Sequence, residues 1–236
     1  MKAFVCHYSK LTERRRYLEQ KLPEVGFNEI EWVTENDIKS YDLETVYDLS
    51  SNALSLRNKS QFSIYGITEQ RPLRRPEIEL TLQHFEAYRR IAEQKNQISI
   101  VFEDDVIFKN KFTRLFPRYL QELPESWDIF YFGRGTGGHF AAKNPKEFAA
   151  YLFGKKRIFL NKKRQSRFTD SYMIKPEAAQ KIIGKCFPFH FPIDWELNYL
   201  QLLLNLNVYW SEPTLTYQGS KSGAYSQSLK KNSGRI

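Results

Sequence analysis

Apolar and polar residues follow two periods along the 236-residue chain. Short apolar runs bounded by Gly, Pro or polar residues indicate strands, and apolar residues that recur every three or four positions indicate helices. We expect strands at 3–8, 29–33, 98–102, 127–132, 171–174 and 214–217, and helices at 14–22, 42–56, from 77 to just before 98, 112–123, 176–183 and 194–205, with a loop at 70–76. Strands that alternate with helices predict an α/β fold with a mostly parallel sheet flanked by helices on both faces.

Four positions at the ends of strand patterns are expected to lie close together. His7, Glu35, Glu103 and Gly133 each end or follow such a pattern. In open sheets of parallel strands, ligands bind outside the carboxyl ends of the strands. These positions should therefore share one edge of the sheet. The glycine cluster that begins at Gly133 lacks the spacing of phosphate-binding loops, and we interpret it as a loop beside the site.

Length and charge favour a single domain that meets anionic partners. No shift in composition divides the chain, so we expect one domain over 1–236, with a basic C-terminal tail from about 219 to 236. The formal net charge is +9, and nine Lys or Arg residues lie between Lys143 and Arg167. Basic patches of this kind attract phosphates on nucleotides, nucleic acids or anionic membranes, and they also serve simply to solubilise a surface.

Cysteine usage and the N-terminus indicate a cytoplasmic setting. Cys6 and Cys186 form neither a disulfide framework nor a zinc-binding spacing. The first ten residues do not have the pattern of a signal peptide, and the most apolar later stretch, 199–210, is too short to cross a bilayer. We therefore expect a soluble or peripheral protein.

Three adjacent carboxylates, Glu103, Asp104 and Asp105, lie between the apolar runs 99–102 and 106–108. Neighbouring carboxylates repel one another and a cation between them removes the repulsion, so such a cluster at a strand end indicates a divalent-ion site. A purely oxygen ligand set favours Mg²⁺ or Mn²⁺ over zinc. The alternative is a solvated acidic turn, because short acidic motifs recur by chance. The apolar runs on both sides favour the ion site.

Several motifs, in this order and spacing, resemble those of glycosyltransferase family 25, the lipooligosaccharide galactosyltransferase group. They are Val5-Cys6-His7-Tyr8-Ser9-Lys10 followed by Arg14-Arg15, Glu77-Ile78-Glu79-Leu80-Thr81-Leu82-Gln83-His84, Ile100-Val101-Phe102-Glu103-Asp104-Asp105-Val106, Trp127-Asp128-Ile129 through Gly133, Thr169-Asp170-Ser171-Tyr172-Met173-Ile174 before a helix with Ala178-Ala179, and Pro192-Ile193-Asp194. The resemblance covers most of the chain. Two positions depart from it: Gln83 stands where the family usually has Ser, and His7 where the first strand usually carries Asn or Ser.

The resemblance implies a GT-A fold, a nucleotide-binding α/β sandwich in which the acidic motif holds Mn²⁺, or alternatively Mg²⁺, against the diphosphate of a UDP-sugar. Family members invert the anomeric centre and form β-linkages, most commonly with galactose as the donor sugar. A metal that straddles two phosphate oxygens neutralises the charge that builds up on the departing UDP. On this basis Asp105 is the best metal ligand, Glu103 is a second ligand or a ribose contact, and Asp104 faces the nucleotide.

Transfer with inversion also needs a base near the acceptor hydroxyl, and a carboxylate is the expected group. Asp194 is our leading candidate, because the Pro192-Ile193-Asp194 motif places it at the start of a helix, where its side chain would be fixed. An aspartate at this place is as often an N-cap. Glu196 and Asp170 compete with it for the role of base.

The remaining expected donor contacts are spread along the chain. We predict that the nucleotide-sugar is bound by His7, Ser9, Arg14, Thr34, Glu35, Glu77, His84, Asp104, Asp170, Tyr172, Gln218 and Lys221. His84 is equally well explained as a satisfied core histidine and Arg14 as part of a solvated helix face. Gln218 and Lys221 follow the last predicted strand and either close over the diphosphate as a lid or belong to a frayed basic tail.

Other classes of function remain open. A metal-dependent phosphodiesterase or nuclease would also use an acidic cluster with basic patches, but the sequence shows no second cluster of metal ligands. A nucleic-acid-binding module would explain the charge, although most of the aromatic residues fit core positions. A transferase that has lost catalysis would not need the intact acidic motif. We expect a UDP-sugar donor, a lipooligosaccharide or lipopolysaccharide glycan as acceptor, peripheral contact with the anionic inner face of a membrane, and no nucleic-acid partner.

Overall fold

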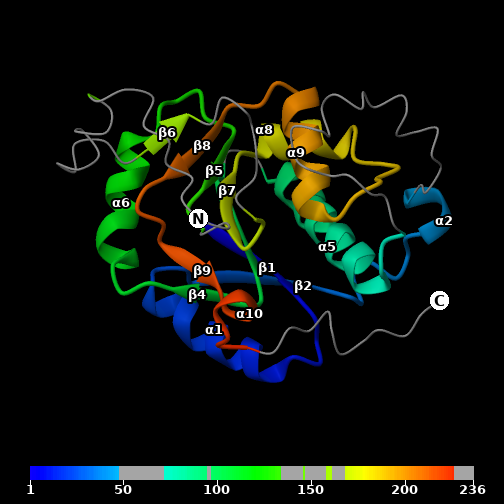
Figure 1. The fold of residues 1–236 in the computed structure, drawn as a ribbon, viewed down its shortest axis with the longest axis horizontal. Coiled ribbons are helices and arrows are strands. Elements are labelled where there is room, and N and C mark those ends of the chain that lie inside the picture. The colour runs from blue at the N-terminus through cyan, green and yellow to red at the C-terminus, as the bar shows by residue number, and fades with distance from the viewer. Residues whose placement is uncertain (48–71, 95–96, 134–145, 147–157, 161–167, 226–236) are drawn as a thin grey trace.

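A mixed seven-stranded sheet forms the centre of the protein. The computed structural model describes residues 1–47, 72–94, 97–133, 146, 158–160 and 168–225 (Figure 1). The strands are β1 (Lys2–His7), β2 (Glu29–Thr34), β3 (Ser99–Glu103), β5 (Ile129–Tyr131), β6 (Ile158–Leu160), β7 (Ser171–Ile174) and β8 (Val208–Ser211), in the spatial order β2-β1-β3-β7-β5-β8-β6. Only β7 and β6 run against the other five. The expected α/β fold with a mostly parallel sheet is confirmed.

Helices cover both faces of this sheet, so the described chain has three layers (Figure 1). The helices α5 (Arg75–Ala92), α8 (Pro176–Ile183) and α9 (Ile193–Leu203) pack on one face, and α1 (Thr12–Glu24) and α6 (Phe112–Glu122) on the other. Alternation along β1 shows the division: Phe4 and Cys6 join the core under α5, whereas Ala3 and Val5 join the core under α1 and α6. Both cores are built by the apolar periodicity that predicts these helices.

Helix α5 begins with an N-terminal cap whose residues also line the site. Its first turn contains Pro76, and the Glu77 carboxylate accepts a hydrogen bond of 2.8 Å from the backbone N–H of Arg74, which closes a capping box. Apolar residues such as Leu82 and Phe85 are fully buried against the sheet. The predicted helix from 77 is confirmed, and it starts slightly earlier, at Arg75, because the proline and the cap together fix the first turn.

A separate two-stranded sheet carries the C-terminal segment to the acidic motif. Strand β4 (Val106–Phe108) directly follows that motif and pairs antiparallel with β9 (Thr216–Gln218). The short helix α10 (Gly219–Ser222) comes next, and the Gly219 N–H donates a 2.7 Å hydrogen bond to the carbonyl oxygen of Asp105. The predicted final strand therefore exists, shifted to 216–218, and it ends at the site.

Several expected element boundaries are corrected by the structure. Pro117 lies inside α6, which continues as one helix across it, and Pro23 lies in the last turn of α1 rather than after it. The predicted helix at 42–56 is present as the short α2 (Leu43–Val46), and the rest of its range from 48 onward lies outside the described residues. Strands β6 and β8 have no counterpart among the predicted strands.

Three of the segments singled out in the sequence lie wholly or partly outside the described residues. The glycine cluster beyond Gly133 falls outside the described residues, as does most of the basic stretch 143–167 and the tail from 226. None of the described helices combines the length and the apolar character needed to cross a lipid bilayer.

Candidate active site

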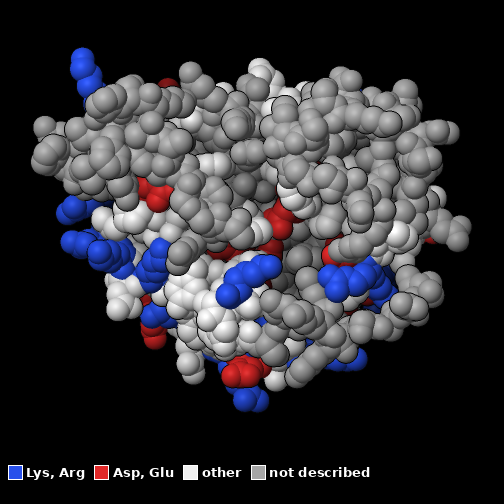
Figure 2. All heavy atoms as spheres, viewed as in Figure 1, with Lys and Arg blue, Asp and Glu red and all other residues white. Residues whose placement is uncertain are grey.

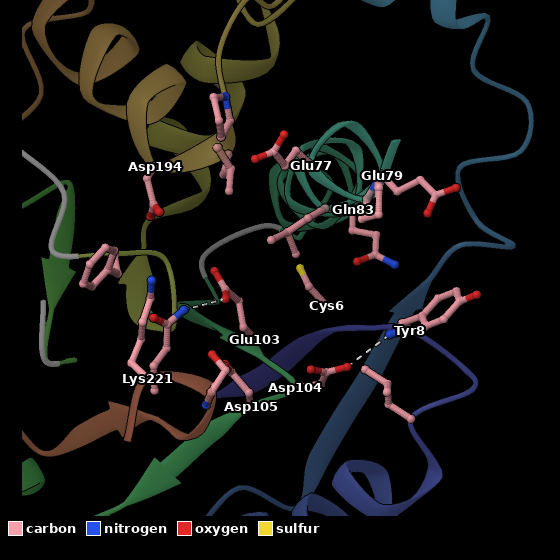
Figure 3. A pocket seen from close by; sticks show the side chains of 18 of the residues that line it. Cys6, Tyr8, Glu77, Glu79, Gln83, Glu103, Asp104, Asp105, Asp194 and Lys221 are labelled. Carbon is pink, nitrogen blue, oxygen red and sulfur yellow. Dashed lines mark hydrogen bonds between the residues drawn. The ribbon is translucent and has the colours of Figure 1, made fainter. Parts of the chain in front are cut away.

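A pocket with a volume of about 470 Å³ opens at the carboxyl ends of β1 and β3. The first turns of α5 and α9 form one side of it, and α10 forms another (Figure 3). Eight of the fifteen predicted site residues line the pocket: Arg14, Glu77, Glu103, Asp104, Asp105, Asp194, Gln218 and Lys221. The space-filling view shows acidic side chains in a hollow near the middle of one face, with basic side chains beside them (Figure 2). Parallel strand ends thus meet at one edge, as expected.

Asp104 ties the first strand and the first helix to β3. Its Oδ1 accepts a 2.6 Å hydrogen bond from the Arg14 guanidinium, and its Oδ2 lies 3.0 Å from His7 Nδ1 and 3.2 Å from the Tyr8 backbone nitrogen. Arg14 is only 6% exposed, so the alternative that it belongs to a solvated helix face is wrong. Both oxygens of Asp104 are occupied by the protein itself.

We expect Arg14→Leu to destabilise the protein by about 3 kcal/mol, because it leaves the nearly buried Asp104 carboxylate without its cation. The comparison is Arg16→Leu, which removes an exposed arginine from the same helix. Urea unfolding of both variants measures the difference. Equal unfolding midpoints for the two variants would contradict this role of Arg14.

Asp105 and Glu103 are held by the C-terminal segment and by the loop before β7. Asp105 Oδ2 accepts hydrogen bonds from the backbone N–H and the hydroxyl of Ser220, at 3.2 and 2.5 Å. Glu103 accepts hydrogen bonds from the Thr169 hydroxyl at 2.6 Å and from the Gln218 amide at 3.2 Å. Burial, and then the Glu103 charge, raises the pKa of Asp105 to about 6, and burial also raises the pKa of Glu103. A bound cation would stabilise both charged forms.

The donor set of the acidic motif fits a divalent cation that takes few ligands from the protein. Asp105 Oδ1 is buried and has no hydrogen-bond partner, so it is available as a ligand. Within the described part of the chain, no three His, Cys, Asp or Glu side chains are grouped to enclose a metal ion. Mg²⁺ is commonly held by one or two carboxylates with substrate phosphates and water completing its shell. Asp105 and Glu103 match that arrangement better than a closed protein cage.

Asp194 extends from the first turn of α9 toward the acidic motif, and the Thr169 hydroxyl lies within hydrogen-bond distance of both Asp194 and Glu103 (Figure 3). It is in the first turn of α9, whose N-cap is Pro192, so the alternative that Asp194 is the N-cap is wrong. Its Oδ1 instead lies 3.0 Å from the hydroxyl of Thr169. Burial, and then the charge of Glu103, raises the pKa of Asp194 to about 7. A carboxyl group with such a pKa is suited to act as a base near neutral pH.

The two competing base candidates are engaged elsewhere. Glu196 is fully buried and accepts backbone hydrogen bonds from His190 at 3.0 Å and Phe191 at 3.2 Å, which fix the turn before α9. Asp170 is also fully buried, and the Ser171 hydroxyl donates to it at 3.1 Å. Neither residue lines the pocket, so of the three candidates the geometry favours Asp194.

Comparison with known proteins decides the family. The sequence profile of glycosyltransferase family 25 (LPS biosynthesis protein) matches residues 1–196. This chain belongs to glycosyltransferase family 25. Membership confirms the resemblance found in the sequence, and the mixed, mostly parallel sheet agrees with the α/β fold that this resemblance implies.

Relatives and structural neighbours are distant. Procollagen galactosyltransferase 2 of Mus musculus is 28% identical over 117 residues, which are 48% of this chain and 17% of that protein. Procollagen galactosyltransferase 1-A of Xenopus laevis is 37% identical over 107 residues, which are 40% of this chain and 18% of that protein. This chain therefore aligns with less than a fifth of the length of these relatives. A UDP-glucose pyrophosphorylase from Acinetobacter baumannii has a TM-score of 0.48 at 14% identity, covering 94% of this chain and 90% of its own.

The remaining predicted residues of this family 25 enzyme lie behind or beside the pocket. They are His7, Ser9, Thr34, Glu35, His84, Asp170 and Tyr172. His84 is fully buried behind Glu103, with its Nε2 3.6 Å from a Glu103 oxygen and its Nδ1 2.8 Å from the Tyr172 hydroxyl. Burial lowers the pKa of His84 to about 3, so the imidazole is neutral at physiological pH. His84 and Tyr172 thus lie in the core behind Glu103, and their direct contact with a donor stays a prediction.

The residues beyond the ends of β1 and β2 bond with one another. The Ser9 backbone N–H donates to Glu35 at 3.0 Å, and the Ser9 hydroxyl contacts the same carboxylate. Thr34 donates from its backbone N–H and its hydroxyl to Asp37, at 2.7 and 2.9 Å. A nucleoside contact by Ser9, Thr34 or Glu35 therefore remains a prediction.

Sequence reasoning missed several residues that shape the pocket. Gln83, which departs from the usual family residue, lines the pocket and donates a 3.0 Å hydrogen bond to the His7 carbonyl oxygen, so the two departures are in contact. Thr169 carries no signal of its own beyond its place in the family motif, yet it contacts both Glu103 and Asp194. Ser220 carries no local signal, because its contact with Asp105 depends on the pairing of β4 with β9.

Gly133 is required by close packing beside the acidic residues. A Cβ at this position would lie 2.5 Å from both carboxylate oxygens of Asp170. We expect Gly133→Ala to destabilise the fold by about 2 kcal/mol, since such overpacking displaces a buried side chain. At Gly184 the nearest atoms would lie 3.6 Å away, so Gly184→Ala is the matched control. Thermal unfolding measures both, and equal melting temperatures would refute the packing argument.

Proposed function

We propose that this family 25 enzyme transfers galactose from UDP-galactose, with inversion, to a hydroxyl of a lipooligosaccharide or lipopolysaccharide glycan. The observation that carries the proposal is one pocket lined both by Asp105 and Glu103 at the end of β3 and by Asp194 in the first turn of α9. An inverting transfer needs charge stabilisation at the leaving group and a base at the acceptor, on opposite sides of the sugar. The curated relatives, which are named galactosyltransferases, support galactose as the donor sugar.

On the donor side, we assign Asp105 and Glu103 to a divalent cation, Mn²⁺ or Mg²⁺, that pairs with the diphosphate. When bound, this ion supplies charge neutralisation for the departing UDP. Lys221 lines the pocket from α10 and brings an ammonium group to the same side, which suits contact with a phosphate. Arg14 keeps Asp104 in place, and Gln218 orients Glu103.

On the acceptor side, we assign Asp194 as the base that takes the proton of the attacking hydroxyl. Its pKa of about 7 makes a substantial fraction of the carboxylate available at neutral pH. Trp195 lines the pocket next to it and offers an aromatic surface on which the acceptor sugar can stack. The hydroxyl oxygen forms the new bond to the anomeric carbon, the bond to UDP breaks, and the proton passes to Asp194.

Donor turnover tests the proposal directly. Purified protein is incubated with a panel of UDP-sugars, with Mn²⁺, with Mg²⁺ or with EDTA, and released UDP is measured without acceptor. We expect slow hydrolysis of UDP-galactose that EDTA abolishes. Neither turnover nor binding of any UDP-sugar in the presence of metal would refute the transferase proposal.

An acceptor panel tests the second half of the proposal. Lipooligosaccharide core glycans are compared with procollagen peptides, because the curated relatives are procollagen galactosyltransferases. Transfer to the glycans, with a β-linkage in the product, is the expected result, and exclusive transfer to the peptides would overturn the acceptor assignment. We also propose a cytoplasmic enzyme that contacts anionic membrane through its basic surface, and vesicle co-sedimentation without a preference for anionic lipid would remove that contact.

A further inference from the structure

The Thr169 side chain sits between the two halves of the pocket. Its hydroxyl oxygen lies 2.6 Å from Glu103 Oε1 and 3.0 Å from Asp194 Oδ1. Thr169 itself is 1% exposed and does not line the pocket, so a substrate would not touch it. One hydroxyl therefore lies within hydrogen-bond distance of a carboxylate at the end of β3 and a carboxylate on α9, and its single proton is shared between the two.

The backbone at and before Thr169 also contributes to its contact with Asp194. A backbone hydrogen bond from Thr169 also reaches Asp194, so this residue holds the carboxylate by both its main chain and its side chain. The preceding residue, Phe168, has a φ of 62°, a left-handed conformation that is uncommon for a bulky residue. Such strain persists where the surrounding structure requires it, and it concentrates at functional sites.

Neighbouring contacts leave Thr169 little freedom. The Glu103 backbone N–H donates a 3.0 Å hydrogen bond to the Asp170 carbonyl oxygen, which continues the pairing of β3 with β7. Phe168 lines the pocket, and the Lys221 ammonium lies 5.9 Å from the centre of its ring. The position of Thr169 is thus fixed by the sheet on one side and by the pocket wall on the other.

We propose that Thr169 is a positioning residue that sets the distance and orientation between Glu103 and Asp194, so that the acceptor base faces the sugar held on the donor side. The proposal rests on the proposed function, since it assigns Thr169 to the same reaction. Thr169 acts through the two carboxylates and not on the substrate. A purely structural hydroxyl would affect stability and donor binding, whereas a positioning hydroxyl affects the chemical step.

Three variants test the proposal. Thr169→Val keeps the β-branched shape and the backbone N–H but removes the hydroxyl, and Thr169→Ser keeps the hydroxyl. We expect Thr169→Val to lower kcat about 100-fold and to change the KM for UDP-galactose far less, because misplacing a catalytic group by about 1 Å has an effect of this size. Thr169→Ser should recover most of kcat. Thr45→Val, which removes an exposed hydroxyl on α2, is the control and should behave as wild type.

A double variant shows whether Thr169 acts through Asp194. In the Asp194→Asn background, Thr169→Val should lower kcat much less than it does in the wild type, since one of the two groups that it positions is already gone. Full additivity of the two losses would overturn the proposal, as would a Thr169→Val enzyme with wild-type kcat. Equal losses in the Val and Ser variants, or a rise in KM that accounts for the whole effect, would also overturn it.

Failure of the positioning role can be distinguished from failure of the proposed function. If wild-type protein turns over UDP-galactose and Thr169→Val does too, only the positioning role fails. If wild-type protein binds no UDP-sugar, the proposed function fails, and the thermal unfolding midpoints of Thr169→Val, Asp194→Asn and the double variant still report the contact. Non-additive shifts in the unfolding midpoint support the contact between Thr169 and Asp194, and additive shifts refute it.

Discussion

Asp105→Asn is expected to abolish metal-stimulated turnover of UDP-galactose, with a loss in kcat/KM of at least about 100-fold. Asp105 Oδ1 is the buried carboxylate oxygen that lacks a partner in the protein, and Asn replaces its charge with a neutral amide. The loss should be accompanied by loss of the difference between assays with Mn²⁺ and with EDTA. Measured rates with and without metal, for both proteins, give the result.

The Asp105→Asn variant should fold normally, so a loss of activity can be attributed to the missing charge. Burial, and then the Glu103 charge, raises the pKa of Asp105 to about 6, so its negative charge disfavours the folded state at neutral pH. The amide can still accept the hydrogen bond that the Ser220 N–H donates. Glu177→Gln, on the exposed first turn of α8, is the control for removing one negative charge. An Asp105→Asn enzyme that responds to Mn²⁺ like the wild type would contradict the assignment of Asp105 as a metal ligand.

Asp194→Asn is expected to lower kcat by about 10²- to 10⁴-fold while the KM for the donor stays the same. The side chain is held by Thr169 at 3.0 Å in the first turn of α9, and our proposal assigns it to the acceptor rather than to the nucleotide. Asn preserves the size of the side chain but cannot take a proton. Initial rates at varied donor and saturating acceptor separate the two parameters, and a raised donor KM with unchanged kcat would contradict the role of base.

The pH dependence of activity is a second test of Asp194 as the base. The base must be unprotonated, and the pKa of Asp194 is raised to about 7 by burial and by the Glu103 charge. Activity of the wild type should therefore rise as pH increases through about 7 and level off above it. The limb of the kcat/KM profile near that pH should be missing from the residual activity of Asp194→Asn. A group with this pKa titrates between roughly pH 5 and pH 9. A wild-type kcat/KM that does not change over this range would contradict the role of Asp194 as the base.

The elements with strong local signals were predicted well from the sequence. Helix α8 and strand β7 have the predicted bounds, because Pro176 fixes the start of the helix and a short apolar run defines the strand. Strand β8 was missed, since its apolar residues continue those of α9 and only residues 204–207, with a left-handed Asn205, separate the two elements. Strand β6 was missed because it is three residues long and stands in a basic stretch.

The site was predictable where it is local and unpredictable where it depends on packing. The acidic motif could be read from three adjacent residues at a strand end, and Asp194 from its place at a helix start. By contrast, Ser220 is 115 residues from Asp105 and Thr169 is 66 residues from Glu103, so no sequence period relates them. His84 shows the opposite effect, because its helical face places it in the core behind the site.

The central claim is that the acidic motif binds a divalent cation together with the diphosphate of a UDP-sugar. Electron paramagnetic resonance of free Mn²⁺ tests it without turnover, because bound Mn²⁺ loses the sharp signal of the free ion. We predict that wild-type protein removes the free Mn²⁺ signal when UDP is present, and that Asp105→Asn does not. Equal removal of the signal by both proteins, or none by the wild type with UDP, would contradict the account.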